Sequence, residues 1–165
     1  MTWGKYVLPV DLSRFSFGAT SAITTSLALI VGLDATTNPR MSIVGALLIL
    51  AIADNISDSL GIHVYRESQS QRSDDAIKVY SITNFLTRFA VTLAFVAIVL
   101  SLPLWPAILA SLALGLLVLS VLSYLIAAKQ GANPYTAVLH HVGVAVVVML
   151  TSHLAGNLIS RMFVF

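Results

Sequence analysis

The sequence predicts an all-α membrane protein with five transmembrane helices. Of its 165 residues, 58% are hydrophobic and only 10% are charged, whereas a soluble domain is about 25% charged. Apolar runs recur from Phe17 onward, and they approach the length of about 20 residues that crosses a hydrocarbon core of roughly 30 Å. The runs are continuous and lack the alternation typical of transmembrane strands. A soluble globular fold is therefore excluded, and helices are favoured over strands.

Polar and proline-containing breaks divide the chain into an interfacial segment and one membrane domain. The segment, residues 1–16, has charged and aromatic side chains, with Trp3, Tyr6 and Phe15 expected at the membrane interface. It lacks the apolar run and cleavage site of a signal peptide. The membrane domain, residues 17–163, holds expected spans at 17–33, 42–65, 81–102, 106–128 and 136–163. The connections, of which 66–80 is the longest, are too short for a soluble domain.

The basic residues predict a cytoplasmic N-terminus and an outer C-terminus, because cytoplasmic loops carry an excess of Lys and Arg. In this orientation the cytoplasmic set outnumbers the outer set. The cytoplasmic residues are Lys5, Arg14, Arg66, Arg72, Lys78 and Lys129, and the outer residues are Arg40 and Arg161. We see no eukaryotic targeting signal, so a prokaryotic plasma membrane is the expected location. The basic residues behind the formal charge of +2 then mark the cytoplasmic face of the membrane. No nucleic-acid partner is expected.

Two acidic residues lie inside the second span. Asp54 and Asp58 are four residues apart, so their carboxylates share one helix face. A carboxylate at a span centre costs about 2.5–3.5 kcal/mol, and such groups usually face a cavity, a cation or a proton. Oxygen ligands suit hard divalent cations. The alternative is structural, since both acids can pair with Arg88 of the third span or lie near the cytoplasmic edge. Arg88 either neutralises them or extends to the headgroups.

Further polar residues accompany the acids in the first two spans. His63 lies five residues beyond Asp58, either as a gate ligand and proton acceptor or as an ordinary interfacial histidine. Ser21, Thr24 and Thr25 share one face of the first span. Their hydroxyls either line a polar pathway or bond to carbonyls of their own helix. The sequence leaves both alternatives open.

The last span carries a second polar set. His153 and Asn157 lie one turn apart, where an imidazole and an amide can line a pathway or hydrogen-bond to another helix. His140 and His141 point to different faces, so they do not serve one site easily. The chain has no cysteine, so no disulfide and no thiolate metal site is expected.

Two stretches carry a family resemblance. Residues 17–25 read FGATSAITT and are followed by Leu27, Ala28, Leu29 and Gly32, while residues 59–68 read SLGIHVYRES. They resemble the opening helix and the end of the second helix of the vacuolar iron transporter family. A looser match follows Pro134 in the last span. The resemblance covers most of residues 15–159.

The resemblance implies a five-helix protomer and a homodimer with the translocation pathway at the subunit interface. It also implies proton-coupled export of ferrous iron or manganese from the cytosol, with the metal as cargo and no resident cofactor. Three departures stand out. Ser21 occupies the family's acidic position in the first helix, Leu60 its methionine position, and Ile52 or Ile56 its second acidic position. The family's cytoplasmic metal-binding helices have no room in residues 66–80.

Asp54 and Asp58 can be relocated acids that restore an oxygen-rich site. The expected metal ligands are then Asp54, Asp58 and His63, and the expected pathway residues are Ser21, Thr24, Thr25, Arg88, His153 and Asn157. The competing reading is a family-like membrane scaffold that has lost transport or moves a different solute. An enzyme is not expected, because the chain has no Gly-x-Ser-x-Gly elbow and no His-Glu-x-x-His motif.

Overall fold

The computed structural model describes residues 12–68 and 74–163, and every element in these ranges is a helix. Five helices are long and apolar enough to cross a membrane. They confirm the predicted all-helical membrane fold. The elements are α1 (Leu12–Gly32), α2 (Pro39–Ile49), the π-helix η1 (Leu50–Asp54), α3 (Asn55–Ser68), α4 (Asp74–Ser101), α5 (Leu104–Gln130) and α6 (Pro134–Phe163).

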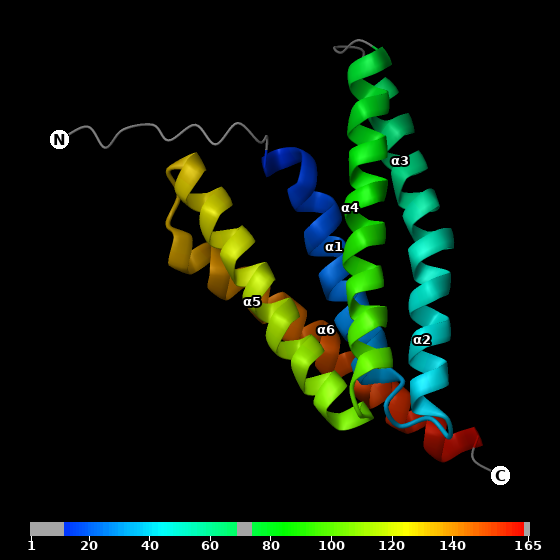
Figure 1. The fold of residues 1–165 in the computed structure, drawn as a ribbon. Coiled ribbons are helices and arrows are strands. Elements are labelled where there is room, and N and C mark those ends of the chain that lie inside the picture. The colour runs from blue at the N-terminus through cyan, green and yellow to red at the C-terminus, as the bar shows by residue number, and fades with distance from the viewer. Residues whose placement is uncertain (1–11, 69–73, 164–165) are drawn as a thin grey trace.

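The helices form two groups that meet at α1. The rod formed by α2, η1 and α3 packs along α4, whereas α5 and α6 form an antiparallel pair, and α1 contacts both groups. Figure 1 shows the α5–α6 pair tilted away from the rod, so that the groups diverge towards the start of α1. The described helices begin at one end of the bundle with α1 and finish at the other end with α6.

Buried aliphatic side chains hold the two groups to α1. Ile23, Leu27 and Ile30 follow one face of α1 and are almost fully buried. They belong to one core cluster with Ile43 and Leu47 of α2, Phe95, Val96 and Val99 of α4, Leu119 of α5, and Ala145 and Met149 of α6. In a bilayer these contacts contribute through close van der Waals packing, because lipid tails are as apolar as the buried side chains.

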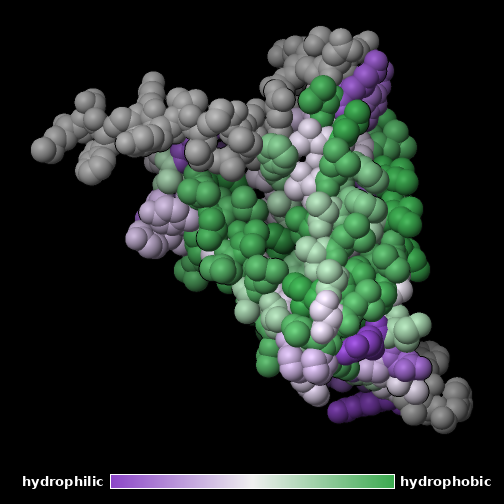
Figure 2. Space-filling model, in the orientation of Figure 1, coloured by the Kyte–Doolittle hydropathy of each residue, from purple (hydrophilic) through white to green (hydrophobic). Residues whose placement is uncertain are grey.

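The outer surfaces are apolar as well. Leu109 and Leu117 of α5 and Leu139, Leu150 and Leu154 of α6 are exposed, and Figure 2 shows hydrophobic residues over the middle of the visible face. Hydrophilic residues gather towards the two ends of that face. This distribution suits an integral membrane protein, because lipid tails accept apolar side chains while the ends meet water.

Proline and glycine set the helix ends near the membrane edges. Pro39 begins α2, where its missing N–H is no loss. Gly131 caps α5 with a φ of +72°, a left-handed conformation that glycine adopts without strain. The side chain of Asn133 then accepts hydrogen bonds from the backbone N–H groups of Tyr135 and Thr136 at the start of α6.

Two local expectations need correction. The second span is no single α-helix, because η1 interrupts it. The connection after it is also shorter than 66–80: α4 already begins at Asp74, and Ile77 is buried in its first turns. Hydropathy finds only the apolar part of a helix, and these helices continue beyond it.

Several of the expected features lie outside the described residues. These are residues 1–11 of the interfacial segment, with Trp3, Tyr6 and Lys5, and also Arg72 in the connection. The side chains of Arg14 and Arg66 lie outside them too.

Candidate functional site

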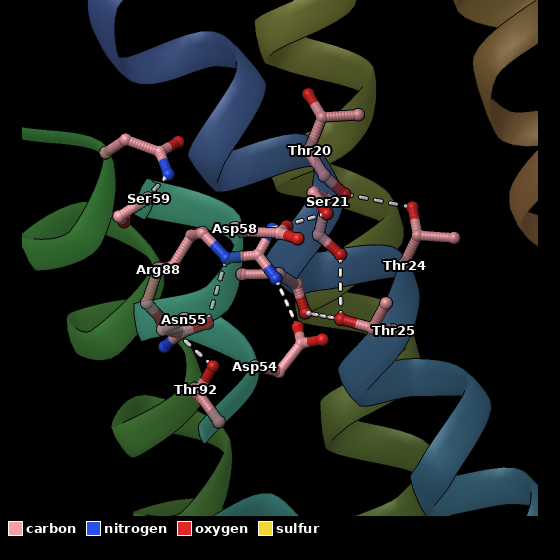
Figure 3. Close-up of polar contacts among 12 residues, drawn as sticks. Thr20, Ser21, Thr24, Thr25, Asp54, Asn55, Asp58, Ser59, Arg88 and Thr92 are labelled. Carbon is pink, nitrogen blue, oxygen red and sulfur yellow. Dashed lines mark hydrogen bonds and ion pairs between the residues drawn. The ribbon is translucent and has the colours of Figure 1, made fainter. Parts of the chain in front are cut away.

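The polar centre of the bundle is the guanidinium of Arg88 on α4. Only 1% of this residue is exposed, and its nitrogens contact two other helices and the end of η1 (Figure 3). Nε donates to Asn55 Oδ1 at 2.8 Å, and Nη1 donates to Ser21 Oγ at 2.5 Å. Nη2 contacts Asp54 Oδ2 at 2.5 Å, and Nη1 lies 2.7 Å from Asp58 Oδ2. Arg88 therefore pairs with the acids and does not extend to the headgroups.

The π-helix η1 helps to align the residues that meet Arg88. Ile43, Leu47, Ala51 and Asn55 recur every fourth residue, and all four are buried. In a regular α-helix with 3.6 residues per turn, such a row drifts by about 40° at each step. A π turn has i→i+5 hydrogen bonds and takes in an extra residue, so it offsets this drift. The wide turn therefore keeps Asn55 and the neighbouring Asp54 on the side of α4.

Glycine and a second layer of polar groups complete the setting of Arg88. A Cβ atom at Gly18 of α1 would lie 2.8 Å from Asn84 Oδ1 and 3.3 Å from Arg88 Cγ, so glycine permits the close approach of α1 and α4. Asn84 Nδ2 donates to Ser59 Oγ at 3.3 Å, and Thr92 Oγ1 donates to the Arg88 carbonyl at 2.9 Å. These contacts hold the arginine on a defined part of α4.

The charges of this cluster do not balance. Two carboxylates share one guanidinium, which leaves one formal negative charge when both acids are ionised. The side chains of Asp54 and Asp58 remain 43% and 37% exposed. Within the described residues, the Oδ1 atom of each acid has no hydrogen-bond partner, since Arg88 contacts only the two Oδ2 atoms. The cluster can thus accept a proton or a cation on its open side.

Two cavities adjoin this side of the bundle. One of about 420 Å³ is lined by residues of α1, α3 and α4, and Asp58, Tyr65 and Tyr80 are among them. Another of about 450 Å³ lies between α1, η1 and α6, where Thr25, Gly32 and Gly156 contribute to its wall. Asp58 is therefore accessible from a recess in the surface as well as paired with Arg88.

The structure separates the expected hydroxyl residues by role. Ser21 bonds to Arg88, whereas Thr24 Oγ1 donates to the Thr20 carbonyl at 3.0 Å and Thr25 Oγ1 donates to the Ser21 carbonyl at 2.9 Å. Of these hydroxyls, only that of Ser21 reaches another helix.

His63 does not join the acids. It is half-buried on α3, and it is absent from the lining of the cavity beside Asp58. Among the described residues, no group of three or more His, Asp or Glu side chains is close enough together to hold a metal ion. A metal at Asp54 and Asp58 would therefore need ligands from beyond these side chains.

His153 and Asn157 lie away from Arg88, near the end of α1. His153 Nδ1 is 3.5 Å from Asp34 Oδ1, and Asn157 Nδ2 is 2.9 Å from His153 Nε2. His141 contacts Ser123 of α5 instead, at 2.9 Å.

Sequence reasoning missed Asn55 and Asp34 as members of these two clusters. An amide next to Asp54 in an apolar span was a usable signal for Asn55. No local signal indicated Asp34, which lies in the turn after α1.

A scan against models of protein families finds no match for this chain, and searches among curated proteins and among solved structures find none either. The family resemblance rests on residues 17–32 and 59–68, which lie in α1 and α3.

Proposed function

We propose that this chain is a membrane transporter that exports a divalent metal cation, of the ferrous iron or manganese class, from the cytosol in exchange for protons. The observation that carries the proposal is the charge imbalance at Arg88. Asp54 and Asp58 together bring one more negative charge than the guanidinium neutralises, and their free oxygens lie on the open side of the bundle. Intramembrane acids arranged in this way are typical of ion and proton pathways.

The exchange follows from the same charges. One bound proton balances the formal charges of the cluster, and burial of an unbalanced charge in a medium of low dielectric constant is costly. A divalent cation that binds to the free oxygens displaces this proton. Arg88 keeps the two carboxylates in place and prevents their full repulsion when neither proton nor cation is bound. The proton and the cation compete for the same carboxylate oxygens, so binding of one favours release of the other, as exchange demands.

A homodimer would complete the site. Ile52, Ile56 and Leu60 form an exposed apolar row beside the acids on η1 and α3. A second copy packed on this row would exclude lipid from the carboxylates and double the number of oxygen ligands. The proposed homodimer is thus consistent with an incomplete metal site in one protomer. The proposed orientation, with a cytoplasmic N-terminus, puts the cavity beside Asp58 nearer to the cytosol.

One observation favours a second function, in which the chain is a scaffold without transport. The two acids lie 2.5 and 2.7 Å from Arg88 nitrogens, distances typical of charge-assisted hydrogen bonds. In this second function, the sole role of the cluster is to hold α3 against α4. Transport and locking differ in what the surplus charge does, and this difference can be tested.

The test measures uptake of Mn²⁺ or Fe²⁺ by proteoliposomes, with and without a pH gradient. The single variants Asp54→Asn and Asp58→Asn leave one carboxylate for one guanidinium, so the buried arginine stays paired while the surplus charge is lost. We expect each variant to keep its melting temperature within a few degrees and to lose most gradient-dependent uptake. Glu67→Gln, an exposed acid on the same helix, is the matched control. Uptake that persists at the wild-type rate in both variants favours the scaffold.

A further inference from the structure

A second set of metal-ligating atoms converges where α1 ends against α6. His153 Nδ1 lies 3.5 Å from Asp34 Oδ1 and 3.4 Å from the carbonyl oxygen of Val31. The Asp34 side chain is only 16% exposed, and its Oδ1 is buried without a hydrogen bond among the described residues. One imidazole nitrogen thus lies within 3.5 Å of two oxygens, and one of these oxygens is a buried acceptor without a hydrogen bond in the described ranges.

Two glycines bring these atoms together. A Cβ atom at Gly156 would lie 1.8 Å from the carbonyl oxygen of Gly32, which no side chain could tolerate. The α1 and α6 backbones are therefore in direct contact one residue from Val31 and three residues from His153. Because the contact involves backbone atoms, the fold fixes the separation of the two backbones from which the three ligating atoms extend.

The spacing fits two ligands of one ion better than a hydrogen bond. An N–H···O hydrogen bond measures about 2.7–3.2 Å, so the separations of His153 Nδ1 from Asp34 Oδ1, 3.5 Å, and from the Val31 carbonyl oxygen, 3.4 Å, are long for hydrogen bonds. Ligands at about 2.0–2.1 Å from a tetrahedral metal ion are separated by about 3.3–3.4 Å. The observed separations are close to this tetrahedral edge.

The electrostatic setting also favours a cation. Val31 lies in the last turn of α1, where carbonyl groups lack partners in the helix and carry its negative dipole end. Asp34 adds a carboxylate. Arg40, the first basic residue after this turn, directs Nη2 to the Leu102 carbonyl instead.

We propose that Asp34 Oδ1, His153 Nδ1 and the Val31 carbonyl form a binding site for a first-row divalent transition metal. Its fourth position faces a cavity of about 370 Å³ between α1, α5 and α6, which Asp34, His153 and Val31 all line. An imidazole ligand selects Zn²⁺, Co²⁺ or Fe²⁺ over Mg²⁺ and Ca²⁺. Metal binding here is independent of transport. The role of this site as the place where the exported cation is released rests on the proposed function.

Asn157 supplies the outer shell of this site. Its amide lies 2.9 Å from His153 Nε2, and its oxygen and nitrogen can exchange places by a flip of the amide. With a metal on Nδ1, the proton of the imidazole resides on Nε2 and Asn157 Oδ1 accepts it. Such a partner fixes the tautomer and orientation of a ligating histidine, and its loss typically weakens metal binding about 10–100-fold.

The first experiment titrates the purified full-length protein in detergent with Co²⁺ and records its visible absorption, with Mg²⁺ as the comparison ion. We expect a band typical of tetrahedral Co²⁺ and no competition by Mg²⁺. Asp34→Asn and His153→Gln should each weaken Co²⁺ binding at least tenfold, and Asn157→Leu by about 10–100-fold. His140→Gln, on the same helix, should leave it unchanged. Absence of the band overturns the proposal, and so does a Co²⁺ affinity equal to that of the wild-type protein in Asp34→Asn and His153→Gln.

A second measurement uses the wild-type protein and so does not depend on the folding of any variant. Histidines are modified with diethylpyrocarbonate with and without Zn²⁺ and are located by mass spectrometry. Zn²⁺ should protect His153 and not His140, and equal modification of His153 in both samples overturns the site. If uptake fails to depend on Asp54 and Asp58 while Co²⁺ still binds at His153, only the proposed function falls. If Co²⁺ binding depends on Asp54 and Asp58 instead, only this site falls.

Discussion

The two polar clusters of this bundle differ in what fills them. At the first, Arg88 supplies a cation from the chain itself and contacts four partners at 2.5–2.8 Å. At the second, His153 Nδ1 lies 3.5 Å from Asp34 Oδ1, and this carboxylate oxygen is buried without a hydrogen bond within the part of the chain that the structure describes. The acids of the first cluster are paired with a guanidinium of the chain. The single acid of the second cluster lacks such a partner among the described residues and can bind an ion from outside.

This contrast explains how similar residues can have different roles in one membrane domain. Two acids beside one arginine leave a surplus negative charge that either a proton or a cation can balance. The first cluster therefore suits coupling between proton and cation. The second cluster offers a carboxylate, an imidazole and a backbone carbonyl, which are three different ligand types, so it suits selection of a transition metal. Four substitutions test this division, and the largest effect is expected at Arg88.

Replacing Arg88 by leucine should cause the largest loss of stability. It leaves Asp54 and Asp58 without their cation, and loss of one partner of a buried ion pair typically costs about 3–5 kcal/mol. Because both acids are partly exposed, we expect about 3 kcal/mol, measured as a lowered melting temperature in detergent. The triple variant R88L/D54N/D58N should regain much of it. An equal loss in Arg161→Leu, at the end of α6, would show that the cluster is no special source of stability.

Gly156→Ala should have the next largest effect and should act on the second cluster. The added methyl group would meet the Gly32 carbonyl at 1.8 Å, so α1 and α6 must separate, and such overpacking costs about 1–3 kcal/mol. Gly143→Ala on the same helix meets nothing within 4 Å and should be neutral or stabilising. The Co²⁺ affinity of the Asp34–His153 site should fall in Gly156→Ala only. An unchanged affinity would mean that the helix contact does not set the ligand spacing.

The sequence predicted the fold better than it predicted these clusters, for a physical reason. Apolar runs of membrane length specify helices by themselves, so the five spans follow from the chain alone. The pairing of Arg88 with Asp54 remained one of two alternatives, because it depends on which faces of α3 and α4 meet. The π turn, which keeps Asn55 on that side, leaves no mark in the hydropathy.

The second cluster was harder still to predict. Asp34 and His153 come from distant parts of the chain, and only the contact between Gly32 and Gly156 brings them together. His153 and Asn157 were recognisable as polar residues in a span, but their partner lies in a turn, where an aspartate is unremarkable.

Asn55→Leu should weaken the first cluster less than the loss of Arg88. The amide is fully buried, and its Oδ1 accepts from Arg88 Nε at 2.8 Å. Leucine is of similar size, so the main effect is that the Arg88 Nε–H group loses its acceptor while Nη1 and Nη2 keep theirs. An unsatisfied buried donor costs about 1–3 kcal/mol. Thermal unfolding in detergent measures the difference, with the exposed Asn38→Leu as the control. An effect on the scale of Arg88→Leu would mean that Asn55, and not the acids, holds the guanidinium.

Ser21→Ala should give the smallest effect, because Nη1 of Arg88 keeps Asp58 as a partner when the Ser21 hydroxyl is lost. We expect a loss of about 1 kcal/mol, within the range for one hydrogen bond. Thr25→Val is the matched control on α1, since the Thr25 hydroxyl bonds only to carbonyls of its own helix. Its effect on thermal unfolding should be smaller than that of Ser21→Ala. Equal effects would mean that Ser21 plays no part in holding Arg88, and that the acids of α3 and η1 position it with Asn55 alone.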